Sequence, residues 1–317
     1  MESTRKLAND LASPNPLTRY RAVDALSARR DENYAMVIDL LANGDPHQRV
    51  GAAEILGRWQ ASGAFEQLVA GTRDRDASVR ARCVEALGRI DPEQAQTALL
   101  QVARDSNPEV RAWVMSVLGR IKSVSSRQIL HAALRDNDPN VRWHAADAIA
   151  HCEGKQAATP LLRMLQDPDP GIRALVAELL GQLKVQAAQD QLIHLLQDPD
   201  YDVRWRAADA IVALGSTRVI VHLLTQLQHD DDGVRWRAAY TLGRLRAKKA
   251  VRPLVDALED KSAHVRARAA EALGLIADPN ALELLHAHEN DIASAGHLGT
   301  VGEVVRAAIE EIERSDK

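Results

Sequence analysis

Tryptophan and arginine side chains occur close together at several points of this 317-residue sequence. Trp143, Trp205 and Trp236 each directly follow an arginine, and Trp113 comes two residues after one. Guanidinium groups bind carboxylates and phosphates through paired N–H donors, and they also stack on aromatic faces. The combination therefore indicates a site for a carboxylate, a phosphate or an acidic peptide.

Two of the segments that contain these tryptophans lack an acidic residue that most of the equivalent segments have. Five residues after the recurrent arginine the sequence usually has Asp or Glu, which can pair with a second arginine along a helix. Around Arg111 and Arg235 this acid is replaced by Ser116 and Tyr240. The candidate partner-binding residues are Trp113, Arg120, Trp143, His144, Trp205, Arg206, Trp236, Arg237, Tyr240 and Arg244.

Catalytic and metal-binding motifs give no comparable signal. The sequence contains neither a glycine-rich phosphate loop nor a GxSxG motif. His286, His288, Glu289 and His297 offer metal ligands, but His286 and His288 are two residues apart and diverge on a helix. We therefore expect no catalytic residue, no cofactor and no metal.

The recurrent arginine marks an internal repeat that must position these side chains. It occurs at residues 19, 49, 80, 111, 142, 173, 204, 235, 266 and 306. The intervals are 30, then 31 seven times, then 40, which is 40 − 31 = 9 residues longer than the rest. Each unit contains two helical segments, with Pro and Asp between them that end the first helix and offer caps to the second. A glycine eight residues after the arginine, such as Gly181, permits close packing or helix termination.

A helical wheel divides the second segment into two faces. Counted from the arginine, positions −1, +3, +4, +7 and +10 share one apolar face, which we expect to be buried. Cys83 and Cys152 fall on that face and are expected in the core, without a disulfide. Positions +1, +2, +5 and +9 are opposite, and four of the five tryptophans lie there. Two interpretations stay open for this face. It binds a partner, or its tryptophans pack on the adjacent repeat and its charges form solvated pairs.

The repeated strings DPNVRWHAADAIA, DPDYDVRWRAADAI and KSAHVRARAAEALG resemble the HEAT-like repeats of the phycobilisome-lyase type. The resemblance covers almost the whole chain and implies an all-α fold, a right-handed α-solenoid of about ten two-helix repeats over residues 1–317. It also implies that the second helices line a concave surface. An Asp or Asn four residues before each of the first eight arginines is implied to form a ladder with it between neighbouring repeats. Residues 1–30 resemble a cap repeat, and residues 280–317 resemble a degenerate repeat with an insertion at 292–304.

Composition restricts the classes of function. Hydrophobic residues make up 46% of the chain and the formal net charge is −4, so a general basic excess for nucleic acid is absent. No hydrophobic leader or membrane-length apolar run is found, and we expect a cytoplasmic protein that does not bind membranes.

The pattern as a whole favours a non-enzymatic adaptor that binds another protein or an acidic peptide along the groove. Two alternatives stay open. A lyase-like protein would hold a propionate-bearing bilin on the same arginines and tryptophans. A nucleic-acid-binding HEAT protein would use the arginines beside aromatics, although the acids of that face oppose it. The oligomeric state is not indicated.

Overall fold

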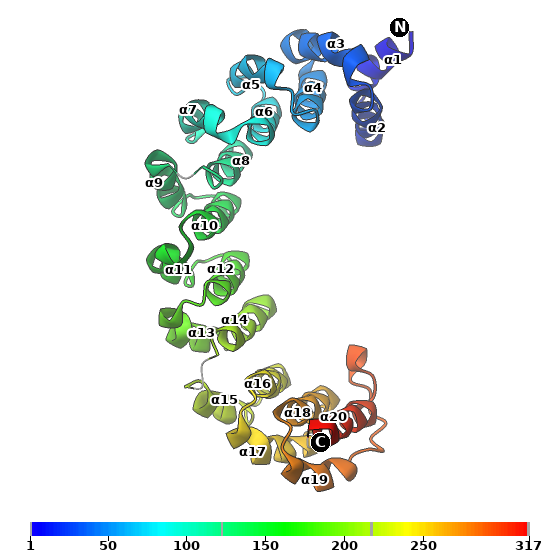
Figure 1. The fold of residues 1–317 in the computed structure, drawn as a ribbon, viewed down its shortest axis with the longest axis vertical. Helices are drawn as coiled ribbons and strands as arrows, with labels where there is room; N and C mark the ends of the chain where they lie inside the picture. The colour runs from blue at the N-terminus through cyan, green and yellow to red at the C-terminus, as the bar shows by residue number, and fades with distance from the viewer. Residues whose placement is uncertain (1, 122, 216–217, 316–317) are drawn as a thin grey trace. The chain divides into compact units, whose positions relative to one another are not determined.

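The computed structural model describes residues 2–121, 123–215 and 218–315, which are almost entirely helical (Figure 1). In those residues the only extended pairing is an isolated bridge between Ser294 and Thr300. The chain divides into two compact units, residues 1–160 and 161–317. Each is described by itself, and the prediction that residues 1–317 form one continuous solenoid stays a prediction.

The N-terminal unit is a stack of helix pairs. Its helices are α1 (Glu2–Asp10), α2 (Pro16–Ser27), α3 (Arg30–Asn43), α4 (Pro46–Arg58), α5 (Phe65–Gly71), α6 (Ala77–Ile90), α7 (Pro92–Val102), α8 (Pro108–Leu118), α9 (Val124–Ala133) and α10 (Pro139–Glu153). The second helices α4, α6, α8 and α10 pack side by side in one layer, and α5, α7 and α9 form the other (Figure 1).

The C-terminal unit repeats this arrangement. Its helices are α11 (Ala158–Met164), which begins just before the division, α12 (Pro170–Gln182), α13 (Gln189–Leu195), α14 (Tyr201–Leu214), α15 (Ile220–Gln226), α16 (Asp232–Arg244), α17 (Val251–Asp256), α18 (Ala263–Ile276), α19 (Leu282–His286) and α20 (Val301–Ser315). The second helices α12, α14, α16, α18 and α20 again form one layer. This α-solenoid fold confirms the predicted fold class.

The acid four residues before the recurrent arginine caps the second helix. The Asp138 carboxylate accepts hydrogen bonds from the backbone N–H groups of Asn140 and Val141, and Pro139 takes the first helical position. Asn107 and Asp231 cap α8 and α16 in the same way. The implied role of these residues in an inter-repeat ladder is wrong, because the arginines form their ion pairs with another aspartate, two residues before the cap position.

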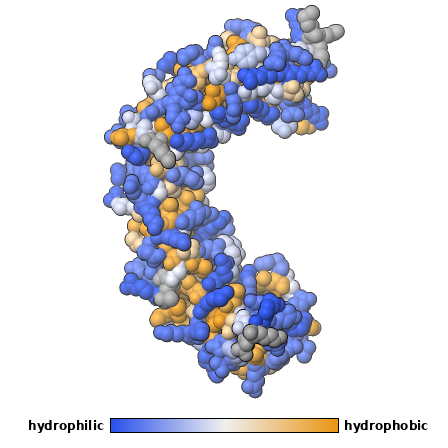
Figure 2. Space-filling view, in the orientation of Figure 1, coloured by the Kyte–Doolittle hydropathy of each residue, from blue (hydrophilic) through white to orange (hydrophobic). Residues whose placement is uncertain are grey.

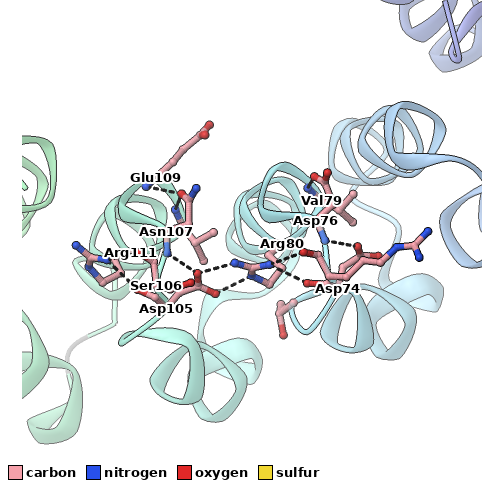
Figure 3. Close-up of polar contacts among 12 residues, drawn as sticks. Asp74, Asp76, Val79, Arg80, Asp105, Ser106, Asn107, Glu109 and Arg111 are labelled. Atoms are coloured by element: carbon pink, nitrogen blue, oxygen red, sulfur yellow. Dashed lines mark hydrogen bonds and ion pairs between the residues drawn. The ribbon is translucent and has the colours of Figure 1, made fainter.

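A ladder does exist, with a different acid (Figure 3). The Arg80 Nε and Nη2 atoms donate to the two carboxylate oxygens of Asp105 in the next repeat, both at 2.7 Å, and Nη1 donates to the Asp74 carbonyl at 2.9 Å. Burial raises the pKa of Asp105, but the hydrogen bonds from Arg80 and the Asn107 backbone outweigh it, and the pKa lies below its usual value. This arginine–aspartate ladder joins residues 25 positions apart: Arg49–Asp74, Arg80–Asp105, Arg111–Asp136, Arg173–Asp198, Arg235–Asp260 and Arg266–Asp291.

The recurrent glycine sets how closely neighbouring second helices approach. A Cβ atom on Gly181 would lie 2.7 Å from the Ala210 Cα atom, and one on Gly243 would lie 2.6 Å from the Ala272 Cα atom. The prediction of close packing is thus confirmed. In α14 the same position is Val212, and by the same register it faces Thr241 of α16. These larger residues keep the helices apart, and α14 and α16 pack less closely than α12 with α14 or α16 with α18.

The predicted apolar face is buried. Val79, Val110, Val141, Val203 and Val265, each just before the recurrent arginine, have no exposed surface. Cys83 is also fully buried, whereas Cys152 is only half-buried, and neither forms a disulfide. The face that Figure 2 shows is mostly hydrophilic, with apolar patches on both units. Among the described residues, no helix combines the length and the apolar character that crossing a bilayer demands.

Candidate functional site

The ten predicted partner-binding residues fall into two groups. Trp113, Arg120, Trp143 and His144 belong to the second-helix layer of the N-terminal unit, and the other six belong to α14 and α16 of the C-terminal unit. The two groups are described separately, and their joint use by one partner stays a prediction.

In the N-terminal unit, Trp113 and His144 line a shallow hollow of about 280 Å³ with residues of α8 and α10. Burial lowers the pKa of His144, which favours the neutral imidazole. Trp143 is 38% exposed, and its ring meets the His144 ring edge-on with centroids 5.0 Å apart. Arg120 is exposed, and its Nη1 atom donates to the Gly88 carbonyl at 3.1 Å.

In the C-terminal unit, the aromatic residues form a cluster between α14 and α16. The ring of Trp205 stacks on that of Tyr240 with centroids 5.0 Å apart, and it lies 5.8 Å from the ring of Trp236. Tyr201, in the first turn of α14, lies 6.3 Å from Trp236. Both tryptophans are half-buried because they fill the space that the wider α14–α16 spacing leaves open. The interpretation that they pack on the adjacent repeat is therefore correct in part, since each also keeps an accessible face.

Arg237 and Tyr240 correct the helical wheel. Both were expected on the exposed face, yet Arg237 is 1% and Tyr240 is 8% exposed. The wheel treats a helix as having two faces, but here each second helix also has a neighbour on either flank, which covers part of the outer face. Position +5 shows the same effect at Glu85, which is buried.

The Arg237 guanidinium is held mainly by aromatic faces. It lies 4.8 Å from the centroid of the Trp236 ring and 5.1 Å from that of Tyr201, distances at which cation–π attraction is effective. Its Nη1 atom donates to the Gly233 carbonyl, while Nε and Nη2 have no hydrogen-bond acceptor. Burial, and then the charge of Arg204, lower the pKa of Arg237 to about 10, so it stays charged at neutral pH.

The remaining predicted residues are paired with neighbours in their own helix or in the adjacent repeat. Arg206 is exposed and forms an ion pair with Glu178 of α12, with 3.0 Å between Nη1 and Oε2. Arg244 donates to the Tyr240 hydroxyl at 2.6 Å, and that hydroxyl donates to Asp209 at 3.1 Å. Burial and the charge of Asp209 raise the pKa of Tyr240. Tyr240 stands where most second helices have an acid, and the carboxylate near Arg244 is instead that of Asp209 in the preceding repeat.

A pocket of about 510 Å³ opens beside the aromatic cluster. We call it the aromatic pocket. It is lined by Tyr201 and Trp205 of α14, Asp232 and Trp236 of α16, His264 and Arg268 of α18, and His297 and Leu298 of the loop before α20. Its walls are mainly apolar with a few polar groups, which is the usual composition of a ligand-binding site.

Sequence reasoning found Trp205 and Trp236 but missed the rest of this lining. Tyr201 precedes the first position of the wheel, and Arg268 belongs to a unit that has the usual acid, Glu271, with which it pairs in the structure. His297 and Leu298 belong to the predicted insertion at 292–304, the last residues of which form the first turn of α20. The signal for them was the 40-residue interval, which marks an insertion but not where it folds.

The arginine–aspartate ladder has a gap next to this pocket. Twenty-five residues after Arg204 the sequence has His229 in place of an aspartate. The Asp231 N–H donates to the His229 Nδ1 atom at 3.1 Å, as N–H groups donate to the ladder aspartates elsewhere. A neutral histidine ring that accepts a hydrogen bond at Nδ1 carries its proton at Nε2. Its Nε2 atom is then a donor and cannot accept a hydrogen bond from Arg204. Consistently, the buried Nε atom of Arg204 has no acceptor, and its guanidinium lies 5.9 Å from the Tyr201 ring centroid.

The histidines near the C-terminus do not gather into a metal site. His286 pairs with Glu289, His288 lies 3.4 Å from Glu259, and His297 faces Arg268. Within residues 2–121, 123–215 and 218–315, no group of three or more His, Cys, Asp or Glu side chains is placed to hold a metal ion.

Comparison with known proteins identifies the repeat. The pattern described as HEAT repeats matches residues 34–105, 65–150, 96–174, 158–239 and 220–292, which together cover residues 34–292. The chain belongs to the HEAT-repeat family. No curated protein sequence matches it.

Solved structures show the same HEAT-repeat fold at low identity. The Escherichia coli protein YibA is similar with a TM-score of 0.58 and 19% identity, over 93% of this chain and 96% of that one. Importin beta is similar with a TM-score of 0.70 and 16% identity, over 98% of this chain and 56% of its own. A structure of Kap95p bound to RanGDP gives a TM-score of 0.67 and 13% identity, over 98% and 56%.

Proposed function

We propose that this HEAT-repeat protein is a non-enzymatic cytoplasmic adaptor that binds another protein through its second-helix layer, with the aromatic pocket as the principal contact. The observation that carries the proposal is the cluster of Tyr201, Trp205 and Trp236, which keeps accessible aromatic surface next to arginines. Tryptophan, tyrosine and arginine are the residues that most often dominate the binding energy of protein interfaces.

The fold supports the same proposal. A solenoid presents a long row of equivalent helices, and each helix varies at its exposed positions without disturbing the core. Kap95p, which has a similar fold, binds the protein RanGDP. The finer assignment to the phycobilisome-lyase repeat type stays a prediction from the sequence.

The proposal is tested by affinity capture from an extract of the cells that produce the protein. The intact chain is compared with the double variant Trp205→Ala, Trp236→Ala, after circular dichroism and thermal melting show that both are folded. A matched double variant, Val221→Ala, Ile292→Ala, removes two apolar side chains that are 74% and 88% exposed outside the pocket. Arg237 is left unchanged because its burial would confuse binding with folding.

Each recovered protein is then purified and its affinity measured directly. We expect the tryptophan variant to bind at least about 30-fold more weakly, since two hot-spot residues contribute about 2 kcal/mol or more. The control variant should bind like the intact chain. Equal affinity for all three proteins contradicts the proposal.

A further inference from the structure

The chemistry of the aromatic pocket restricts what it can bind, and the first restriction concerns cations. Aromatic pockets often bind ammonium or guanidinium groups on their ring faces. Here Trp236 already has the Arg237 guanidinium 4.8 Å and the Arg268 guanidinium 5.6 Å from its centroid. A cationic ligand would be repelled by both charges, so the pocket is unsuited to lysine, arginine or methylated amines.

Arg268 instead offers donors to an anion. It lines the pocket, it is only 8% exposed, and it lies on the rings of Trp236 and Tyr240. Of its five N–H groups, one donates to Glu271 at 2.7 Å, and Nη2 lies a long 3.4 Å from the His297 ring. N–H groups therefore remain for a ligand, and burial strengthens any charge-assisted hydrogen bond that they form.

The excess of positive charge continues behind the pocket wall. Arg237 and Arg204, whose guanidinium groups lie 5.1 and 5.9 Å from the centroid of the Tyr201 ring, both have buried N–H groups without acceptors. Neither has a carboxylate of the arginine–aspartate ladder to neutralise it, because Arg237 is outside the ladder and Arg204 faces its gap. Their field favours one negative charge in the pocket.

The rim limits how much negative charge the pocket accepts. Asp232 is an exposed residue of the pocket lining, its carboxylate accepts a hydrogen bond from the Ser262 hydroxyl at 2.9 Å, and Asp230 and Asp231 directly precede it in the chain. These acids repel a phosphate chain or a nucleic acid backbone. A single carboxylate bound to Arg268 is repelled less by these acids than a polyanion, which would have to pass close to all of them.

The remaining lining is apolar. Tyr201, Trp205 and Leu298 present ring and aliphatic surface, and a cavity of about 510 Å³ has room for a large side chain and the peptide unit next to it. Burial of such a side chain contributes about 1.5–3 kcal/mol.

We propose that the aromatic pocket binds a peptide carboxylate that is adjacent to a large apolar side chain, with the carboxylate on Arg268 and the side chain against Trp205 and Tyr201. The inference rests on the proposed function and names the part of the partner that the pocket recognises. The carboxylate comes either from an Asp or Glu side chain or from a chain terminus.

The test follows the five tryptophan indole N–H signals of the full chain by ¹H–¹⁵N nuclear magnetic resonance. The acidic probes are acetyl-Phe-Glu-amide, which carries a side-chain carboxylate, and acetyl-Ala-Phe with a free terminus. Acetyl-Phe-Gln-amide, acetyl-Ala-Phe-amide, acetyl-Phe-Lys-amide and inorganic phosphate are the controls. The titrations are repeated with Arg268→Met, which keeps an apolar stem, and with Arg252→Met as a matched arginine that also pairs with an acid of its own helix but lies outside the pocket.

We expect the Trp205 and Trp236 signals to shift, and at least one acidic probe to bind at least tenfold more tightly than its amide. The preferred acidic probe identifies the source of the carboxylate. Arg268→Met should abolish the preference and Arg252→Met should keep it. Equal binding of acidic, neutral and lysine probes, tighter binding of phosphate, or an unchanged preference in Arg268→Met overturns the inference. If the carboxylate inference fails but partner binding still requires Trp205 and Trp236, the proposed adaptor function is retained.

Discussion

The gap in the arginine–aspartate ladder predicts that one substitution stabilises the protein. His229→Asp places a carboxylate 25 residues after Arg204, the spacing of every closed pair such as Arg235–Asp260. In that pair Nε and Nη2 donate at 2.6 and 2.9 Å, and the two side chains are 7% and 12% exposed. The new carboxylate would give the buried Arg204 Nε atom an acceptor and would keep the hydrogen bond from the Asp231 N–H.

The size of the effect follows from two opposing contributions. Two charge-assisted hydrogen bonds contribute about 1.5–3 kcal/mol each, and the cost of removing a carboxylate from water offsets much of this. We expect a net gain of about 1–2 kcal/mol in the free energy of unfolding. Asp260→His, which opens a closed pair and leaves Arg235 buried without its partner, should cost about 3–4 kcal/mol.

The pH dependence gives a second signature. In Asp260, burial raises the pKa, and the hydrogen bond from Arg235 more than reverses it, so the folded-state pKa lies below the unfolded value of about 3.9. A carboxylate of this kind stabilises the fold fully above the unfolded pKa and loses its effect as the pH falls through the folded one. The gain from His229→Asp should thus be present at pH 7 and be lost as the pH falls below the unfolded pKa of about 3.9.

Urea unfolding and hydrogen exchange of the α14 and α16 amides measure this effect globally and locally. Gln228→Asp adds the same acid one residue out of register at an exposed position and should change stability by less than about 0.5 kcal/mol. If His229→Asp is neutral or destabilising while Asp260→His destabilises, the reasoning about the gap is refuted.

Three further predictions test the packing. Gly243→Ala should destabilise by about 1–3 kcal/mol in urea unfolding, because the added Cβ would lie 2.6 Å from the Ala272 Cα atom; unchanged stability would refute the close approach. Burial raises the pKa of the Cys83 thiol to about 12, so at pH 8 a thiol reagent should modify Cys152 first and Cys83 only on unfolding; early modification of Cys83 would contradict this. Tyr240→Phe removes the hydroxyl that joins two repeats and should cost about 1 kcal/mol in the same unfolding assay, whereas no loss would show that the bridge is not formed.

The repeat made the fold predictable from the sequence. Ten arginines, nine of them 30 or 31 residues apart, fixed the register of the second helices, and the valine or isoleucine before most of them identified the core correctly. The helix caps followed from Pro and Asp for the same reason, since these are local effects of neighbouring residues.

The site was predictable only in part, because it depends on contacts between repeats. Trp205 and Trp236 were found from their position on one helix. The burial of Arg237 and the bridge from Tyr240 to Asp209 depend on the flanking helices, which a single helical wheel does not contain. The ladder acid was misassigned because Asp74 and Asp76, two residues apart, look equivalent in the sequence, and only the fold shows which one faces the preceding arginine.

The most direct test of the adaptor function is site-specific photocrosslinking in cell extract. A photoreactive amino acid replaces Arg206, which is exposed on α14 directly after Trp205, or Arg252, whose side chain is 83% exposed on the first helix α17. Our account predicts a crosslinked protein from position 206 that is absent at position 252 and is lost when Trp205 and Trp236 are changed to Ala. Crosslinks of equal strength from both positions, or from position 252 alone, would contradict it.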